Sequence, residues 1–194
     1  MMRTVRTEEI IEKILETERL YLRKMDDTDY PDLCKILMDE ETMYAYEGAF
    51  SDEEAKGWLA RQKERYEKDG FGLWAVVLKE TGEMIGQCGI TMQNVDGEMK
   101  PEIGYLFRRS FWHHGYAAEA AKGCREYAFR TLGVPDICSV IRDTNRASQN
   151  VALRNGMKLT GGFTKHYRGV DMPHIIFSIS REEWEKLGTE NTKG

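Results

Sequence analysis

The stretch from residue 102 to residue 129 constrains the fold of this chain more than any other part of it. Its start alternates, with Ile103, Tyr105 and Phe107 on one side, which predicts a short strand. A second strand is predicted at 137–142. Between them, small apolar residues recur at helical spacing, which predicts a helix packed on a sheet; they are Ala117, Ala121, Cys124 and Ala128. Two parallel strands around a helix predict an α/β protein.

The turn into that helix has the sequence WHHGYA, residues 112–117. Gly115 lets the backbone turn sharply and come close to a ligand. The first N–H groups of the helix have no partner inside it, and they lie at the positive end of the helix dipole. The turn therefore predicts an anion site suited to phosphate. On spacing alone, a strand-to-helix connection without a ligand is the alternative, since such glycine turns are common.

The rest of the pattern predicts one domain, at 17–187. A helical extension is expected at 1–16 and a flexible polar tail at 188–194. Within the extension, 7–16 has the caps and apolar stripe of a helix, packed on the edge of the domain or serving as a dimer arm.

Within the domain, strands and helices are recognised by their hydrophobic periods and their turn residues. The segment 95–100 is expected to be a polar turn into the central strand. Ser51 and Glu54 form a capping box for a helix that ends at residue 68. The other predicted elements are strands at 17–23, 71–79, 83–93, 157–166 and 170–180, and helices at 26–39, after Asn145 and at 181–187.

Two segments resemble a known family. The run PEIGYLFRRSFWHHGYAAEAA and the later NRASQNVALRNGM are similar to the Gcn5-related N-acetyltransferase (GNAT) superfamily, most of all to its RimJ/RimL-like branch of ribosomal-protein and N-terminal acetyltransferases. The resemblance covers residues 18–179. It implies a mixed, mostly antiparallel sheet of six to seven strands, flanked by helices, whose central strands splay apart around acetyl-CoA.

The resemblance also implies which residues bind acetyl-CoA. The family loop reads Gln/Arg-x-x-Gly-x-Gly/Ala, and its amides hold the pyrophosphate. Gly115 and Ala117 match, whereas Trp112 stands where Gln or Arg is usual. Main-chain amides do not depend on that side chain. The implied cofactor contacts are Leu106 and Phe107 to the pantetheine and thioester, the loop residues Trp112, His113, His114, Gly115, Tyr116 and Ala117 to the pyrophosphate, and Asn145, whose alternative role is that of a turn residue.

Transfer to an amine needs a neutral nucleophile. An α-amino group with a pKa of about 7.8 is roughly 14% neutral at pH 7, so its deprotonation costs about 1.1 kcal/mol. For a lysine side chain, with a pKa of about 10.4, the cost is about 4.6 kcal/mol. Glu102 is the expected general base, because its strand borders the acyl site in the resembling family. The alternatives are that Glu102 is merely exposed, or that Glu83 or Glu98 is the base.

The leaving thiolate of coenzyme A needs a proton or a hydrogen bond. Many family members place a tyrosine in the short helix after the second parallel strand, but the matching residue here is Ala152. Ser148 can donate a hydrogen bond to the sulfur, although it is a weak acid. The alternative role of Ser148 is that of an N-cap.

Composition and charge exclude several classes of function. The net charge of −5 argues against a broad basic face for nucleic acid and fits a cationic amine acceptor. The four cysteines show no Cys-x-x-Cys spacing and are expected to be reduced, as in the cytoplasm. No apolar signal segment or membrane span is expected. His113 and His114 are adjacent in a loop without a third ligand, so no metal is expected.

The leading hypothesis is therefore an acetyl-CoA-dependent N-acetyltransferase that acts on a primary amine, above all a protein N-terminus. One alternative is a small amine, such as a polyamine or an amino sugar. Another is a domain that binds acyl-CoA as a sensor without turnover, which the lack of the usual tyrosine supports. A homodimer is compatible with the N-terminal extension.

Overall fold

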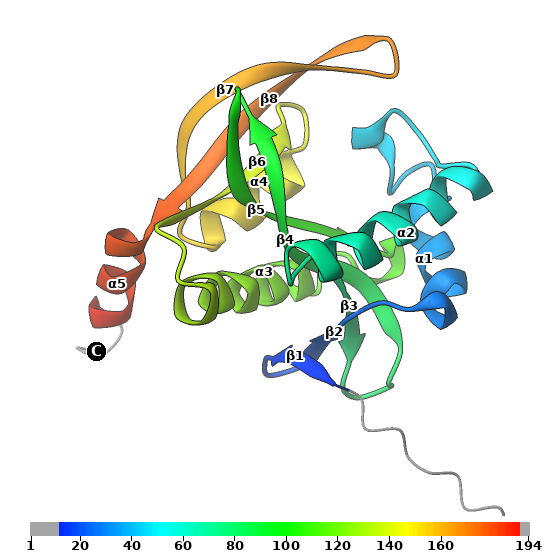
Figure 1. Cartoon of the computed structure of the whole chain (residues 1–194), viewed down its shortest axis with the longest axis horizontal. Coiled ribbons are helices and arrows are strands. Elements are labelled where there is room, and N and C mark those ends of the chain that lie inside the picture. The colour runs from blue at the N-terminus through cyan, green and yellow to red at the C-terminus, as the bar shows by residue number, and fades with distance from the viewer. Residues whose placement is uncertain (1–11, 191–194) are drawn as a thin grey trace, which may run out of the picture.

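A computed structural model describes residues 12–190, and these contain eight strands in one mixed sheet (Figure 1). The strand order is β1-β2-β3-β4-β5-β6-β8-β7, and every neighbouring pair is antiparallel except β5 and β6. The strands are β1 (Lys13–Glu16), β2 (Leu20–Arg23), β3 (Leu73–Leu78), β4 (Met84–Val95), β5 (Glu98–Phe107), β6 (Asp136–Arg142), β7 (Lys158–Tyr167) and β8 (Val170–Ser180).

Helices cover both faces of the sheet. The described α-helices are α1 (Tyr30–Leu37), α2 (Asp52–Lys68), α3 (Tyr116–Tyr127), α4 (Arg146–Arg154) and α5 (Arg181–Glu190). The side chains of β3 point alternately to the two faces of the sheet, so their contacts show which helices cover each face. Leu73, Ala75 and Val77 pack with the apolar residues of α1 and α2. Trp74, Val76 and Leu78 belong to the cluster that contains α3. α2 and α3 therefore lie on opposite faces.

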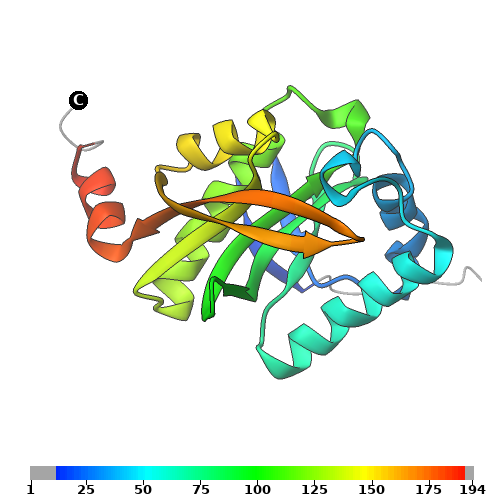
Figure 2. The same cartoon turned by 90° about the horizontal axis from the view of Figure 1, so that it is seen from above.

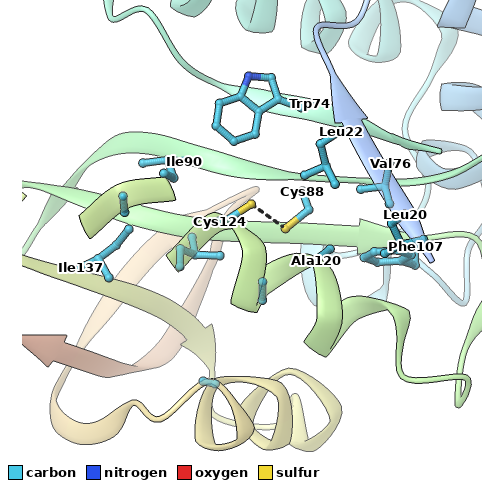
Figure 3. Close-up of a cluster of buried hydrophobic side chains, with 14 of the residues drawn as sticks. Leu20, Leu22, Trp74, Val76, Cys88, Ile90, Phe107, Ala120, Cys124 and Ile137 are labelled. Atoms are coloured by element: carbon cyan, nitrogen blue, oxygen red, sulfur yellow. Dashed lines mark hydrogen bonds between the residues drawn. The ribbon is translucent and has the colours of Figure 1, made fainter. Parts of the chain in front are cut away.

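The larger core lies between α3 and the sheet (Figure 3). Cys124 of α3 and Cys88 of β4 meet there with their sulfur atoms 3.5 Å apart, and all four cysteines are free thiols. Trp74 and Phe129 are among its largest fully buried side chains. Burying a side chain of this kind contributes about 1.5–3 kcal/mol, so this cluster holds α3 firmly against the strands.

The two parallel strands part almost at once. β4 and β5 pair at ten positions, from Gly86 with Phe107 to Val95 with Glu98. β5 and β6 pair only at Glu102 with Cys138. Beyond that pair, the edge of β5 that faces away from β4 has no strand paired with it. The predicted α/β fold with splayed central strands is confirmed, and the fold has one strand more than the six to seven expected.

The additional strand, β1, corrects the predicted helix at 7–16. Residues 7–11 of that helix lie outside the described residues, and Lys13–Glu16 pairs with β2 instead. Ile14 and Leu15 pack onto the α3 core from the edge of the sheet. A side chain at Gly123 of α3 would come within 2.9 Å of Leu15. This close packing outweighs the local helical pattern. The tail predicted at 188–194 is also partly helical, since α5 extends to residue 190.

The polar turn expected at 95–100 is a tight hairpin instead. β4 extends to Val95 and β5 begins at Glu98, so only Asp96 and Gly97 connect them. Both have positive φ, 51° and 90°. An Asp-Gly pair is a strong signal for such a two-residue turn, and the sequence reasoning missed it.

None of the described helices is long and apolar enough to cross a membrane.

Candidate active site

α3 begins at a sharp turn around Gly115. This residue precedes the helix with a φ of 81°, in the left-handed region that favours glycine. The first bond within the helix runs from the N–H of Glu119 to the carbonyl of Gly115, at 3.0 Å. The N–H groups of residues 116–118 therefore have no partner within the helix. With the helix dipole behind them, they have the geometry that the predicted anion site requires.

The loop before α3 is anchored by the residue that departs from the family pattern. The indole Nε1 of Trp112 donates to the carbonyl of Phe107 at 2.8 Å. The carbonyl of Trp112 lies 2.7 Å from Nδ1 of His114, whose ring stacks on Tyr116 with centroids 5.7 Å apart. Trp112, which stands at the position where the family pattern has Gln or Arg, thus ties the loop to the end of β5.

A second anchor of this loop is Arg19, which lies near the start of the described chain. Arg19 donates to the carbonyl of His114 at 3.0 Å, and its Nε donates to Glu119 at 2.6 Å. Its guanidinium also lies 4.5 Å from the ring centroid of Tyr116. Arg19 and Glu119 are separated by 100 positions in the sequence, so no local pattern could have paired them.

The gap between β5 and β6 is lined by alternate residues of β5. The carbonyls of Pro101 and Ile103 accept hydrogen bonds from Cys138 and Ser139 of β6. Because successive residues of a strand turn their backbone groups to opposite sides, Tyr105 and Phe107 also face the gap. Leu106 bonds towards β4 instead. The main chain of Leu106 therefore does not face the gap in which a pantetheine arm is expected, whereas that of Tyr105 and that of Phe107 do.

A cavity of about 520 Å³ opens beside the gap. It is lined by β4, β5 and β6, by the segment before α2, by α2 itself and by the β7–β8 hairpin. Seen from above, this hairpin reaches across towards the start of α2 (Figure 2). Arg168 at its tip pairs with Glu54, and its guanidinium lies 5.2 Å from the ring of Phe50. Tyr46, Phe50 and Trp58 form one wall, as an edge-to-face aromatic cluster.

Glu102 is the one carboxylate among the described residues that line this cavity. Its Oε1 accepts from the N–H of Val140 at 3.0 Å, so the side chain bridges β5 and β6 where they part. No described donor is bonded to its Oε2. Burial raises the pKa of Glu102, while the charges of Lys165 and Arg65 and the Val140 N–H act in the opposite direction. A carboxylate of raised pKa that faces a cavity is suited to accept a proton.

The two alternative bases lie elsewhere. Glu83 pairs with Arg108, and Glu98 at the β4–β5 hairpin is 3.0 Å from Lys100. Neither lines the cavity. Glu102 is therefore the candidate base that the geometry favours.

The start of α4 closes the cavity on the other side. Asn145, and not Ser148, is the N-cap of α4, because its Oδ1 accepts from the N–H of Ser148 at 3.0 Å. The Ser148 hydroxyl therefore has no capping bond and makes no hydrogen bond within residues 12–190. Tyr105 reaches across the gap, and its OH donates to the Ser148 carbonyl at 2.9 Å. Ala152, at the position of the usual tyrosine, is buried.

Replacing Ser148 with alanine should lower the turnover number only a few-fold, by about 1 kcal/mol, because the hydroxyl is a hydrogen-bond donor and a weak acid. The check is to compare kcat of the wild type and of the variant, measured with an acceptor that both proteins bind with equal affinity. A loss greater than about 100-fold would mean that Ser148 protonates the thiolate, which contradicts its assignment as a hydrogen-bond donor.

The predicted site residues thus fall into two groups. Glu102, Leu106, Asn145 and Ser148 line the cavity. Phe107, at the end of β5, and the loop at 112–117, which leads into α3, are not among the residues that line it. His113 is exposed and has a φ of 64°. No group of three or more described His, Cys, Asp and Glu side chains is placed to hold a metal ion.

Comparison with known proteins identifies the fold family. Residues 19–158 match the family model described as an acetyltransferase (GNAT) domain. YkkB of Bacillus subtilis is 36% identical over 164 residues, which cover 84% of this chain and 93% of YkkB. An acetyltransferase crystal structure from Agrobacterium tumefaciens has a TM-score of 0.73 at 30% identity, covering 88% and 95% of the two chains. RimL, a ribosomal L7/L12 α-N-protein acetyltransferase solved with coenzyme A, has a TM-score of 0.71 at 18% identity, covering 87% and 98%.

Proposed function

Because the chain belongs to the GNAT family of acetyl-CoA-dependent N-acetyltransferases, we propose that it acetylates a protein N-terminal α-amino group, as in the RimJ/RimL-like branch. The observation that carries this proposal is Glu102, held between the parting strands with one carboxylate oxygen free in the cavity. The pantetheine arm lies in the β5–β6 gap, and the acceptor enters from the α2 side.

Different residues of the chain would bind acetyl-CoA, accept the proton of the amine and stabilise the leaving thiolate. The thioester of acetyl-CoA supplies the activated acetyl group. The N–H groups of residues 116–118 hold the diphosphate, and the main chain of Tyr105 and Phe107 orients the pantetheine. Glu102 takes one proton from the amine as the new C–N bond forms and the C–S bond breaks, directly or through water. Ser148 donates a hydrogen bond to the departing thiolate, whose conjugate acid has a pKa of about 8.5, so full protonation is not required.

An α-amino group suits this machinery better than a lysine side chain. At pH 7 its deprotonation costs about 1.1 kcal/mol, against about 4.6 kcal/mol for lysine. Among the described residues that line the cavity, Glu102 is the one carboxylate, and Ser148, the expected donor to the thiolate, is a weak acid, so the site fits the less demanding amine. RimL, which has this fold, is named for acetylation of such a group.

The test compares two forms of one peptide. The first has a free N-terminus and dimethylated lysines, and the second has an acetylated N-terminus and free lysines. Release of the coenzyme A thiol is followed with each peptide. We expect turnover with the first peptide only. Turnover with the second alone, or with neither peptide, would overturn the proposal.

We place the activity in the cytoplasm, because free thiols such as Cys88 and Cys124 fit a reducing compartment. A homodimer remains a prediction. Half of the helix proposed as its arm, residues 7–11, lies outside the described residues, and Lys13–Glu16 belongs to the sheet.

A further inference from the structure

The cavity beside Glu102 is rich in positive charge, although the whole chain carries a net charge of −5. Arg61, Arg65, Arg142 and Lys165 all line it, against the single carboxylate of Glu102. The overall acidity of the chain suggested a cationic acceptor, but the charge of this cavity points the other way. Local charge, and not net charge, decides what a cavity of this kind attracts.

Most of these cations have no acidic partner. Arg142 pairs with Glu47. In contrast, Arg61, Arg65 and Lys165 make no ion pair within residues 12–190. Arg61 lies 5.7 Å from the ring of Trp58, and Lys165 lies 5.6 Å from that of Phe163.

Arg65 is the most constrained of the three. It donates to the side-chain oxygen of Gln62 at 3.2 Å. It is half-buried, and this desolvation, together with the nearby charge of Arg61, lowers its pKa. The more distant charges of Asp69 and Glu102 act in the opposite direction, but neither residue forms an ion pair with Arg65, so the lost solvation is not fully offset. An anion bound in the cavity would supply a counter-charge.

The phosphates of acetyl-CoA do not account for these cations. Arg61 and Arg65 belong to α2, whereas the diphosphate site lies at the start of α3 on the opposite face of the sheet. Glu102 is on the α2 face, because it alternates with Ile103, which belongs to the α3 core. The charges of Arg65 and Lys165 act on the Glu102 carboxylate. Arg65 and Lys165 therefore lie on the acceptor side of the base, and the more exposed Arg61 lines the same cavity.

We propose that the acceptor amine carries an anionic group, a carboxylate or a phosphate, which Arg61, Arg65 and Lys165 bind while the amine faces Glu102. This proposal rests on the proposed N-acetyltransferase function. At a protein N-terminus, the anion is an acidic or phosphorylated side chain close to the first residue. In a small molecule, it is the acceptor's own carboxylate or phosphate. Polyamines, which carry only positive charge, are excluded by the same argument.

The experiment uses matched pairs of acceptors with the full-length protein. One pair is a peptide with aspartate at its second residue and the same peptide with asparagine. The other pair is a phosphorylated amino sugar and its unphosphorylated parent. For each pair, the ratio of kcat/KM for the anionic member to that for the neutral member is measured by thiol release. We expect a ratio of about 10 or more for one pair, since hydrogen bonds to charged groups are worth about 1.5–3 kcal/mol.

Variants then assign the preference to the cavity. Arg65→Gln and Lys165→Gln should each lower the ratio about tenfold, mainly through KM of the anionic acceptor. Lys165→Arg should retain it. Lys56→Gln is the control on the exposed side of α2, where Lys56 pairs with Asp52 outside the cavity. Lys165 is only partly buried and lies on the β7–β8 hairpin, so its variants keep the test valid if Arg65→Gln does not fold.

The results of this experiment distinguish a failure of the anion proposal from a failure of the proposed acetyltransferase function. If the anionic and neutral members react equally, or if the ratio survives both glutamine variants, the anion proposal fails while the acetyltransferase function stands. If no amine of either kind releases thiol from acetyl-CoA, the proposed function fails, and the anion proposal fails with it. The pair that shows the preference identifies the acceptor as a peptide or a small molecule.

Discussion

Replacing Gly115 with valine should weaken acetyl-CoA binding by about 100-fold or more while the protein stays folded. The turn needs a φ of 81°, which costs a residue with a Cβ about 1–2 kcal/mol. A branched residue would therefore strain this turn and displace the N–H groups of residues 116–118 that follow it. Losing two hydrogen bonds to a charged diphosphate, at about 1.5 kcal/mol each, gives an effect of this size. Titration calorimetry with acetyl-CoA measures it.

Gly133 offers a matched control for backbone strain. It ends the helical segment that begins after Gly115 and has a φ of 70°, and a Cβ added to it would meet no described residue beyond its chain neighbours within 4 Å. Gly133→Val should lower the melting temperature about as much as Gly115→Val does, yet bind acetyl-CoA normally. At Gly115 itself, the nearest atom to an added Cβ is Nη2 of Arg19 at 3.5 Å, an ordinary contact. Unchanged affinity in Gly115→Val would remove the diphosphate from this loop.

Glu102→Gln should reduce kcat/KM about 100-fold or more under conditions where the amine is protonated and Glu102 is ionised. Glutamine can still accept the hydrogen bond from Val140, which is 3.0 Å from Oε1. It cannot accept the proton of the amine. The loss is therefore chemical and not structural, and steady-state kinetics with one acceptor measure it.

The pH dependence of this variant gives a second, sharper result. Burial raises the pKa of Glu102. As the pH falls through that raised pKa, the wild type loses its base and with it its advantage over Glu102→Gln. The difference is largest above the pKa of Glu102 and below that of the amine, where free amine is scarce. A pH–rate profile that is the same in both proteins would exclude Glu102 from the mechanism.

Stability measurements separate these effects from unfolding. Because the native pKa of Glu102 is raised, the folded state binds its proton more tightly than the unfolded state does. The wild type therefore loses stability as the pH rises from the ordinary carboxyl range through the raised pKa, and this cost is fully present above it. Glutamine does not titrate, so Glu102→Gln should be at least as stable as the wild type at neutral pH in urea unfolding.

Much of the fold follows from local patterns. The predicted strand at 170–180 and the helix after Ser51 match β8 and α2. The unit of strand, glycine turn and helix was also readable, because each part depends on residues that are close in sequence. β1 was not, because its pairing with β2 is supported by packing against Gly123, a contact between residues that are distant in sequence. The β4–β5 hairpin was readable from Asp96-Gly97 and was missed.

Some residues of the candidate site could likewise be predicted from local sequence patterns, and others could not. Gly115 and Glu102 could be identified from a motif, since both lie in the run that resembles the family. The Arg19–Glu119 pair and the cap at Asn145 required the fold. The cationic cavity is the clearest case, because α2 supplies Arg61 and Arg65 while the distant β7 supplies Lys165. Only the assembled sheet brings these side chains together around one base.

The most direct test of the account is a crystal structure of the protein with coenzyme A. We expect the diphosphate on the N–H groups of residues 116–118 and the sulfur in the gap between β5 and β6, next to the Ser148 hydroxyl, with Glu102 facing the open side. A diphosphate bound elsewhere, or a gap closed by side chains with the sulfur outside it, would contradict the account.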